Sequence, residues 1–84
     1  MFEKINRMIE ERFLDEDYIA INDENGVHIS EVIEEMLEND EAISDYSVDY
    51  DETFDSPGCT IYYVSIAYIE NSKLEHITYI AESR

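Results

Sequence analysis

Apolar residues recur at helical spacing in two separate stretches of the chain. The first stretch predicts a helix over about residues 2–14; its apolar positions are Phe2, Ile5, Met8, Ile9 and Phe13. The second predicts a helix for which Ser30 is the N-cap, with an apolar arc formed by Ile29, Val32, Ile33, Met36 and Leu37. The opposite arc of this second helix is acidic and consists of Glu31, Glu34, Glu35 and Glu38.

Two β-patterns surround the second helix. Residues 18–22 are a short run of β-favouring residues, and the turn-forming sequence DENG follows at residues 23–26. After the helix, two kinds of side chain alternate, which predicts a half-buried strand. One face of that strand holds Tyr46, Val48 and Tyr50, and the other holds Asp45, Ser47, Asp49 and Asp51.

The C-terminal third of the chain predicts a hairpin. Residues 52–58 contain the one proline and the second glycine, which indicates a loop. Residues 59–69 are apolar on both faces and predict a central strand, which residues 70–73 connect to a last strand over 74–81. We therefore expect a single α+β domain over residues 1–84. Its order is helix, strand, helix and then a three-stranded antiparallel meander, with the helices packed beside a twisted antiparallel sheet.

Charge is distributed unevenly along the 84 residues. The formal net charge is −17, and the stretch between Phe13 and Ser72 holds seventeen acidic residues and no lysine or arginine. The ends of the chain hold five acids and five bases, which cancel. Self-repulsion on this scale opposes the compact state, and solubility needs far less charge. The charge therefore indicates a surface that meets a cationic partner.

The sign of the charge limits the class of partner. An acidic protein repels nucleic acid and anionic membranes, so we expect neither as a partner and expect a basic protein surface instead. Carboxylates on one face of a strand repeat every two residues, about 6.8 Å, which is also the axial length of about two nucleotides of one DNA strand. The single cysteine, Cys59, and the absence of a signal-peptide pattern indicate a cytoplasmic protein.

Few residues offer catalytic or metal-binding chemistry. His28 and His76 are far apart in sequence, and Cys59 has no obvious base beside it. Asp49, Asp51 and Asp55 match three positions of a calcium-binding EF-hand loop, but its glycine and its final glutamate are missing. We therefore expect a protein that is not an enzyme and that binds no cofactor or metal.

Two stretches of the chain resemble the phage-encoded uracil-DNA glycosylase inhibitors, a family of small acidic DNA-mimic proteins. The stretches are residues 23–37 (DENGVHISEVIEEML) and residues 50–55 (YDETFD). The resemblance implies a one-to-one inhibitor, monomeric when free, that occupies the DNA-binding groove of the glycosylase. Glu24 and Asn25 stand where the family has an acid followed by a small hydroxyl residue, and Gly26 replaces a family isoleucine.

The resemblance also implies two sets of contact residues. The set that would imitate phosphates comprises Asp23, Glu24, Asn25, Glu31, Glu34, Glu35, Asp49, Asp51 and Glu52. The family has an apolar cavity between its second helix and the sheet, which receives the side chain that the glycosylase inserts into DNA. Here that cavity would be lined by His28, Ile33, Met36, Leu37, Val48, Ile61 and Tyr63. The same side chains would form the core in any fold of this type.

Other interpretations of the composition stay open. A phage anti-CRISPR or anti-restriction DNA mimic would carry the same charge against a different basic groove. An immunity protein or antitoxin that neutralises a basic nuclease would also be acidic and rich in tyrosine, and an acidic adaptor domain is the least specific alternative. Most of the tyrosines are expected in the core or sheet, whereas Tyr46 and Tyr50 lie beside the acids and could anchor a partner.

Overall fold

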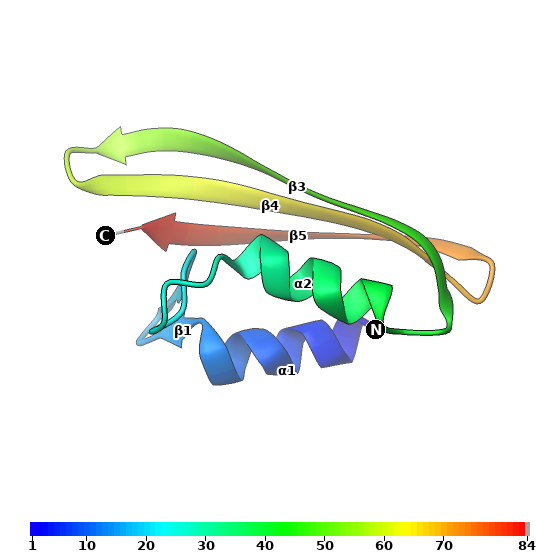
Figure 1. Ribbon diagram of the computed structural model, residues 1–84. Coiled ribbons are helices and arrows are strands. Elements are labelled where there is room, and N and C mark those ends of the chain that lie inside the picture. The colour runs from blue at the N-terminus through cyan, green and yellow to red at the C-terminus, as the bar shows by residue number, and fades with distance from the viewer. Residues whose placement is uncertain (84) are drawn as a thin grey trace.

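Two helices lie beside one five-stranded sheet (Figure 1). The computed structural model describes residues 1–83, and for residues 54–56 the backbone alone. The strands are arranged in the order β1-β2-β5-β4-β3. The α+β class expected from the sequence is confirmed. The elements are α1 (Phe2–Arg12), β1 (Leu14–Asp15), β2 (Tyr18–Ala20), α2 (Ile29–Glu38), β3 (Ile43–Ser56), β4 (Cys59–Glu70) and β5 (Lys73–Ser83).

The last three strands form an antiparallel meander, as expected, but they are longer than the sequence pattern predicted. The loop predicted over residues 52–58 is wrong, because Glu52 and Thr53 pair with Tyr62 and Ile61 and the turn is confined to the Pro57-Gly58 end. The hairpin predicted over residues 70–73 is confirmed. Its two central residues, Asn71 and Ser72, both have positive φ (51° and 68°), the geometry of the tight turns that match the twist of a hairpin.

The sheet is mixed rather than wholly antiparallel. β2 runs parallel to β5, with Ile19 opposite Ala81, and β1 adds a two-residue edge that the sequence did not predict. The predicted strand over residues 18–22 ends at Ala20, and Asn22 makes an isolated bridge to His28. The partner of β2 comes from the far end of the chain, so no local pattern could indicate its direction.

Both helices bury their apolar stripe against the same face of the sheet. α1 contributes Ile5, Met8 and Ile9 to the core, and α2 contributes Ile29, Val32, Ile33 and Leu37. From the sheet come Val64, Ile66, Tyr68 and Ala81. Every second residue of β4 from Val64 to Tyr68 is buried, so one face of the three long strands meets the helices and the other has no layer over it.

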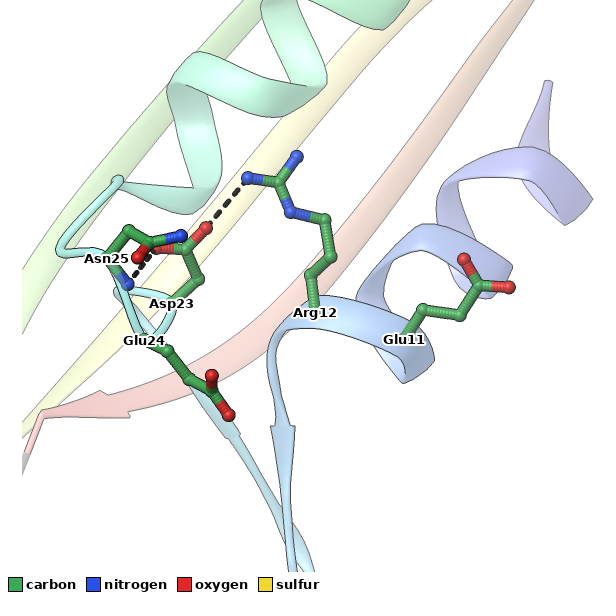
Figure 2. Close-up of a pocket in the computed structure, with 5 residues that line it drawn as sticks. All are labelled: Glu11, Arg12, Asp23, Glu24 and Asn25. Carbon is green, nitrogen blue, oxygen red and sulfur yellow. Dashed lines mark hydrogen bonds and ion pairs between the residues drawn. The ribbon is translucent and has the colours of Figure 1, made fainter.

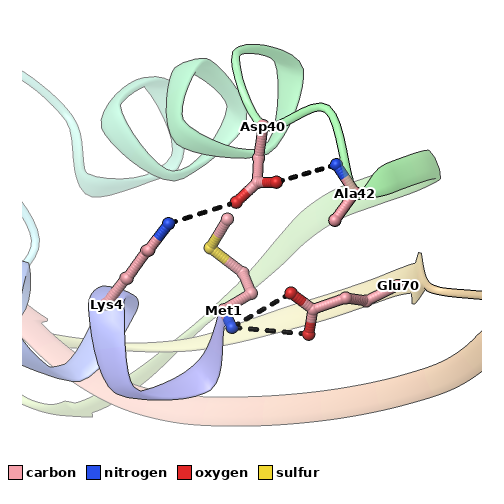
Figure 3. A network of polar contacts seen from close by, with 5 residues as sticks. All are labelled: Met1, Lys4, Asp40, Ala42 and Glu70. Atoms are coloured by element: carbon pink, nitrogen blue, oxygen red, sulfur yellow. Dashed lines mark hydrogen bonds and ion pairs between the residues drawn. The ribbon is translucent and has the colours of Figure 1, made fainter.

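Polar contacts fix the first turn of α1 to the loop after α2 and to the end of β4 (Figure 3). The Met1 amino group donates to the Glu70 carboxylate, and Lys4 pairs with Asp40 at 3.4 Å. Asp40 also accepts a hydrogen bond from the Ala42 backbone N–H, and that bond together with Lys4 lowers the pKa of Asp40. Within the described residues, neither helix is long and apolar enough to cross a membrane.

Candidate interaction surface

β3 forms one edge of the sheet, and its side chains alternate between the two faces as predicted. Tyr46, Val48 and Tyr50 lie opposite Tyr68, Ile66 and Val64, which are buried, so these three β3 side chains face the helices. The intervening residues project from the uncovered face, and the acidic ones among them are Asp45, Asp49 and Asp51. One row of carboxylates therefore follows the edge strand on the side away from the helices.

A second row of carboxylates lies on α2, on the helix side of the same edge. Glu31, Glu34 and Glu38 are exposed on α2, which packs against β3. Burial raises the pKa of Tyr46, and the negative charges of Glu38 and then Glu34 raise it further, so both carboxylates are close to this β3 side chain. Glu35 is also exposed but points about 100° further round the helix than Glu34.

The two rows together define a surface that we call the anionic ridge. Glu52 continues it on the helix side of β3, opposite Tyr62. Burial raises the pKa of Tyr62, and the nearby Glu52 carboxylate raises it further. The members of the ridge are Glu31, Glu34, Glu38, Asp45, Asp49, Asp51 and Glu52.

Aromatic rings lie between the two acidic rows. The His28 ring centroid is 4.5 Å from that of Tyr50 and 6.4 Å from that of Tyr62. Tyr46 is 36% exposed and Tyr50 is 48% exposed, so both rings remain partly accessible beside the carboxylates. The expectation that these two tyrosines lie next to the acids is confirmed; their contact with a partner stays a prediction.

His28 is the N-cap of α2, so the prediction that Ser30 caps this helix is wrong. The His28 Nδ1 accepts a hydrogen bond from the Ser30 backbone N–H at 3.2 Å, and the Ser30 hydroxyl lies 2.7 Å from the same nitrogen. Partial burial of the ring lowers the pKa of His28, and the negative charge of Glu31 opposes this effect. His28 thus lies beside β3 at the start of the ridge and not in a cavity beneath α2.

The Asp23 carboxylate already binds groups of its own chain, which removes it from the phosphate-mimic candidates (Figure 2). Its Oδ2 accepts from Arg12 Nη2 at 2.7 Å, and its Oδ1 accepts from the backbone N–H groups of Asn25 and Val27, both at 2.9 Å. The Val27 N–H and then Arg12 are the main causes that lower the pKa of Asp23. Asp23 therefore holds the turn before α2.

Glu24 and Asn25 are exposed on that turn and stay candidates. With Glu11, Arg12 and Asp23 they line an open depression of about 180 Å³, and the Glu24 side chain points away from the ion pair (Figure 2). The DENG turn itself is confirmed, with Gly26 at φ 78°.

The residues expected to line an apolar cavity do not come together. Ile33 and Leu37 are 0% and 1% exposed and belong to the filled core, and Met36 and Val48 pack partly buried against that core. Ile61 and Tyr63 project from the opposite face of the sheet, because Tyr62 and Val64 between and beside them face the helices. Since β4 is apolar on both faces, its sequence did not indicate which face is covered.

The uncovered face has an apolar part that the sequence analysis missed. Tyr63 is 43% exposed, and Leu74 and Ile80 are more exposed still. The register places Asp51, Tyr63 and Ile80 side by side across β3, β4 and β5. The sequence held one indication of this uncovered face: it predicts only two short helices, which can cover one face of a sheet but not both.

No metal-binding group of three or more histidine, cysteine or acidic residues is found within the described part of the chain. Asp49 and Asp51 lie in a regular strand rather than a calcium-binding loop, and the side chain of Asp55 lies outside the described residues. Cys59 is a free thiol at the start of β4. Comparisons with protein-family models, with curated proteins and with solved structures give no match to this chain.

Proposed function

We propose that this protein is a DNA mimic that blocks the DNA-binding groove of a basic enzyme, and that a uracil-DNA glycosylase is the target. The observation that carries the proposal is the anionic ridge, whose two rows of carboxylates flank one exposed strand. The choice of a glycosylase rests on the resemblance of residues 23–37 and 50–55 to the phage inhibitors.

The ridge acids have no cation within the described chain to neutralise them. The ion pairs among the described residues use Asp23, Asp40, Glu70 and Glu75, none of which belongs to the ridge. α2 and β3 contain no lysine or arginine. A cationic groove would relieve the repulsion among these carboxylates on binding, which favours a basic partner over a neutral one.

The acidic residues are also distributed unevenly over the uncovered face. On the uncovered face, Asp49 is followed across the sheet by Ser65 and Thr78, and Asp51 by Tyr63 and Ile80. No acid lies across the sheet from Asp49 or Asp51 on that face, although Glu82 at the end of β5 adds a separate carboxylate to it. Asp49 and Asp51 are two residues apart in an extended strand, about 6.8 Å, which matches two nucleotide steps of one DNA strand.

Charge and apolar contact would have separate roles. The carboxylates would accelerate encounter with a basic groove, an effect that weakens as salt is added. The partly exposed rings of Tyr46 and Tyr50 are the best anchors against dissociation, since tyrosine is enriched among residues that dominate binding energy. The filled core beneath α2 leaves no room there for an inserted side chain, so the family's cavity is not part of this proposal.

The test is uracil excision from DNA by a purified glycosylase, with and without an equimolar amount of the protein. We expect inhibition that weakens for the double variant Asp49→Asn/Asp51→Asn, mainly through a slower association rate. The matched control is Glu3→Gln/Glu10→Gln, which removes the same charge from exposed positions of α1 and should inhibit like the parent. Unchanged excision with the parent protein, at both low and moderate salt, would exclude the glycosylase as target.

The same purified protein can then be tested on other DNA enzymes. Inhibition of a restriction endonuclease or a CRISPR nuclease, with the same dependence on Asp49 and Asp51, would retain DNA mimicry and change the target. If every enzyme with a basic groove is left active, the mimicry itself is wrong.

A further inference from the structure

The outer edge of β3 carries backbone groups that no strand satisfies. β3 is the last strand in the sheet order, and within the described residues its strand partner is β4 alone. The Tyr46 N–H donates to a side chain of β3 itself, Asp45 Oδ1, at 2.9 Å. Because the direction of backbone groups alternates along an antiparallel strand, Val48, Tyr50 and Glu52 turn their N–H and C=O groups to the same open edge as Tyr46.

Long open edges are sites of unwanted pairing, and proteins protect them with charge. Here the protecting groups all have one sign. A second copy of this chain pairing with β3 would bring the row of Asp45, Asp49 and Asp51 beside an identical row, and like charges on paired strands are destabilising. A strand that carries positive charge would gain attraction at the same positions.

We infer that the basic partner contributes an extended segment that pairs with β3 as an added strand. This inference rests on the proposed function. Its backbone would bond to Tyr46, Val48, Tyr50 and Glu52. On the uncovered face it would place lysine or arginine next to Asp45, Asp49 and Asp51. On the helix side it would place apolar or aromatic residues next to Tyr46 and Tyr50, which are partly exposed.

Such a segment has a readable pattern. Side chains of a strand alternate between faces, so basic and apolar residues would alternate over about seven to nine positions. Main-chain hydrogen bonds would provide the affinity and the alternating side chains the specificity, as in other cases of strand addition.

The test uses a synthetic nine-residue peptide in which lysine and valine alternate. One control peptide has the same composition with the lysines in a block, and another carries N-methyl groups on the amides that would bond to β3. We expect each control to bind at least tenfold more weakly by calorimetric titration. We also expect the bound alternating peptide to slow amide hydrogen exchange at Tyr46, Val48, Tyr50 and Glu52.

Equal affinity for the three peptides, or unchanged exchange at those four amides, would overturn strand addition and leave a purely electrostatic surface. Strand addition by a partner would also be overturned if, without peptide, the four amides exchange more slowly as the protein concentration is raised. The strand paired with β3 would then belong to a second copy of the chain.

A variant separates this inference from the proposed function. Val48→Pro removes one outward N–H, a position where an edge strand tolerates proline, and Val48→Ala is the control for lost packing. We expect Val48→Pro to bind the peptide at least tenfold more weakly than Val48→Ala and to inhibit the glycosylase less.

If Val48→Pro folds and inhibits fully while Asp49→Asn/Asp51→Asn does not, strand addition is wrong and DNA mimicry stands. A parent protein that binds the peptide at this edge but inhibits no enzyme would refute the proposed function alone. If Val48→Pro fails to fold, the N-methylated peptide decides.

Discussion

Neutralising one carboxylate in the middle of the ridge should make the protein more stable. Asp49 lies between Asp45 and Asp51 on the same face of β3, at distances of about 14 and 7 Å along the strand. In 0.01 M salt, where the Debye length is about 30 Å, repulsion from Asp51 amounts to about 0.5 kcal/mol and that from Asp45 to about 0.2 kcal/mol, with water as the dielectric. We therefore expect Asp49→Asn to raise the free energy of unfolding by about 0.7 kcal/mol at this salt concentration.

Screening gives the prediction a second, sharper part. At 0.15 M salt the Debye length falls to about 8 Å, and the same two repulsions together amount to only about 0.3 kcal/mol. For a domain of this size the low-salt gain corresponds to a rise in Tm of about 3–5 °C. Thermal unfolding followed by circular dichroism at the two salt concentrations measures both values.

Glu10→Gln is the matched control, because Glu10 is exposed on α1 and stands three residues after Arg7. Its removal loses the attraction of the Arg7 charge one helical turn away, worth at most about 0.2–0.5 kcal/mol, so it should not stabilise. Our reasoning fails if Asp49→Asn gives no gain at low salt, if the gain is independent of salt, or if Glu10→Gln gives the same gain.

Three further predictions concern the cap, the core and a turn. The pKa of His28 is lowered in the folded state, so its contribution to stability is complete above its unfolded pKa near 6.5 and is lost as the pH falls through its folded pKa. The difference in unfolding free energy between the parent and His28→Asn should therefore shrink from pH 8 to pH 5. A difference that stays constant over this range would contradict the lowered pKa of His28. Ile33→Ala should lower the free energy of unfolding, measured in urea, by about 2–5 kcal/mol, because Ile33 is fully buried. Tyr63→Ala should lower it by less than about 1 kcal/mol, because Tyr63 is half-exposed. A loss below about 1 kcal/mol for Ile33→Ala would indicate a cavity beside Ile33 instead of a filled core. Ser72→Gly should stabilise by about 0.4–1 kcal/mol, because Ser72 has φ 68° in a turn that favours Asn-Gly, and any loss of stability would contradict the turn geometry.

Local patterns predicted the elements that depend on near neighbours in sequence. The apolar arcs of α1 and α2 and the hairpin at Asn71 and Ser72 follow from residues at most a few turns apart, and all three are present. The end of α1 and the cap of α2 were each misplaced by two residues. His28 is an uncommon N-cap, and its ring nitrogen replaces the expected serine hydroxyl.

Features that depend on distant pairing could not be predicted. The direction of β2 is set by β5, some sixty residues away. The covered face of β4 is set by which of two apolar rows meets the helices, and a shift of one residue exchanges them. This single ambiguity placed Ile61 and Tyr63 in a cavity with Ile33 when they lie on the other side of the sheet. Only the ion pair of Asp23 depends on a more distant residue, Arg12 at the end of α1; its bonds to the Asn25 and Val27 N–H groups are local.

The same carboxylates can serve both the fold and the partner. β3 is a fourteen-residue edge strand, well above the usual strand length of about five or six residues, and an edge of this length invites pairing with any exposed strand. A mixture of positive and negative charge would prevent much of that pairing without self-repulsion. Charge of one sign prevents pairing with a second copy and with other acidic edges but not with a basic segment. Its cost is the repulsion calculated for Asp49, which is small enough at physiological salt for the domain to tolerate. Uniform charge on an open edge is therefore what the proposed basic partner would require, whereas solubility alone would not require it.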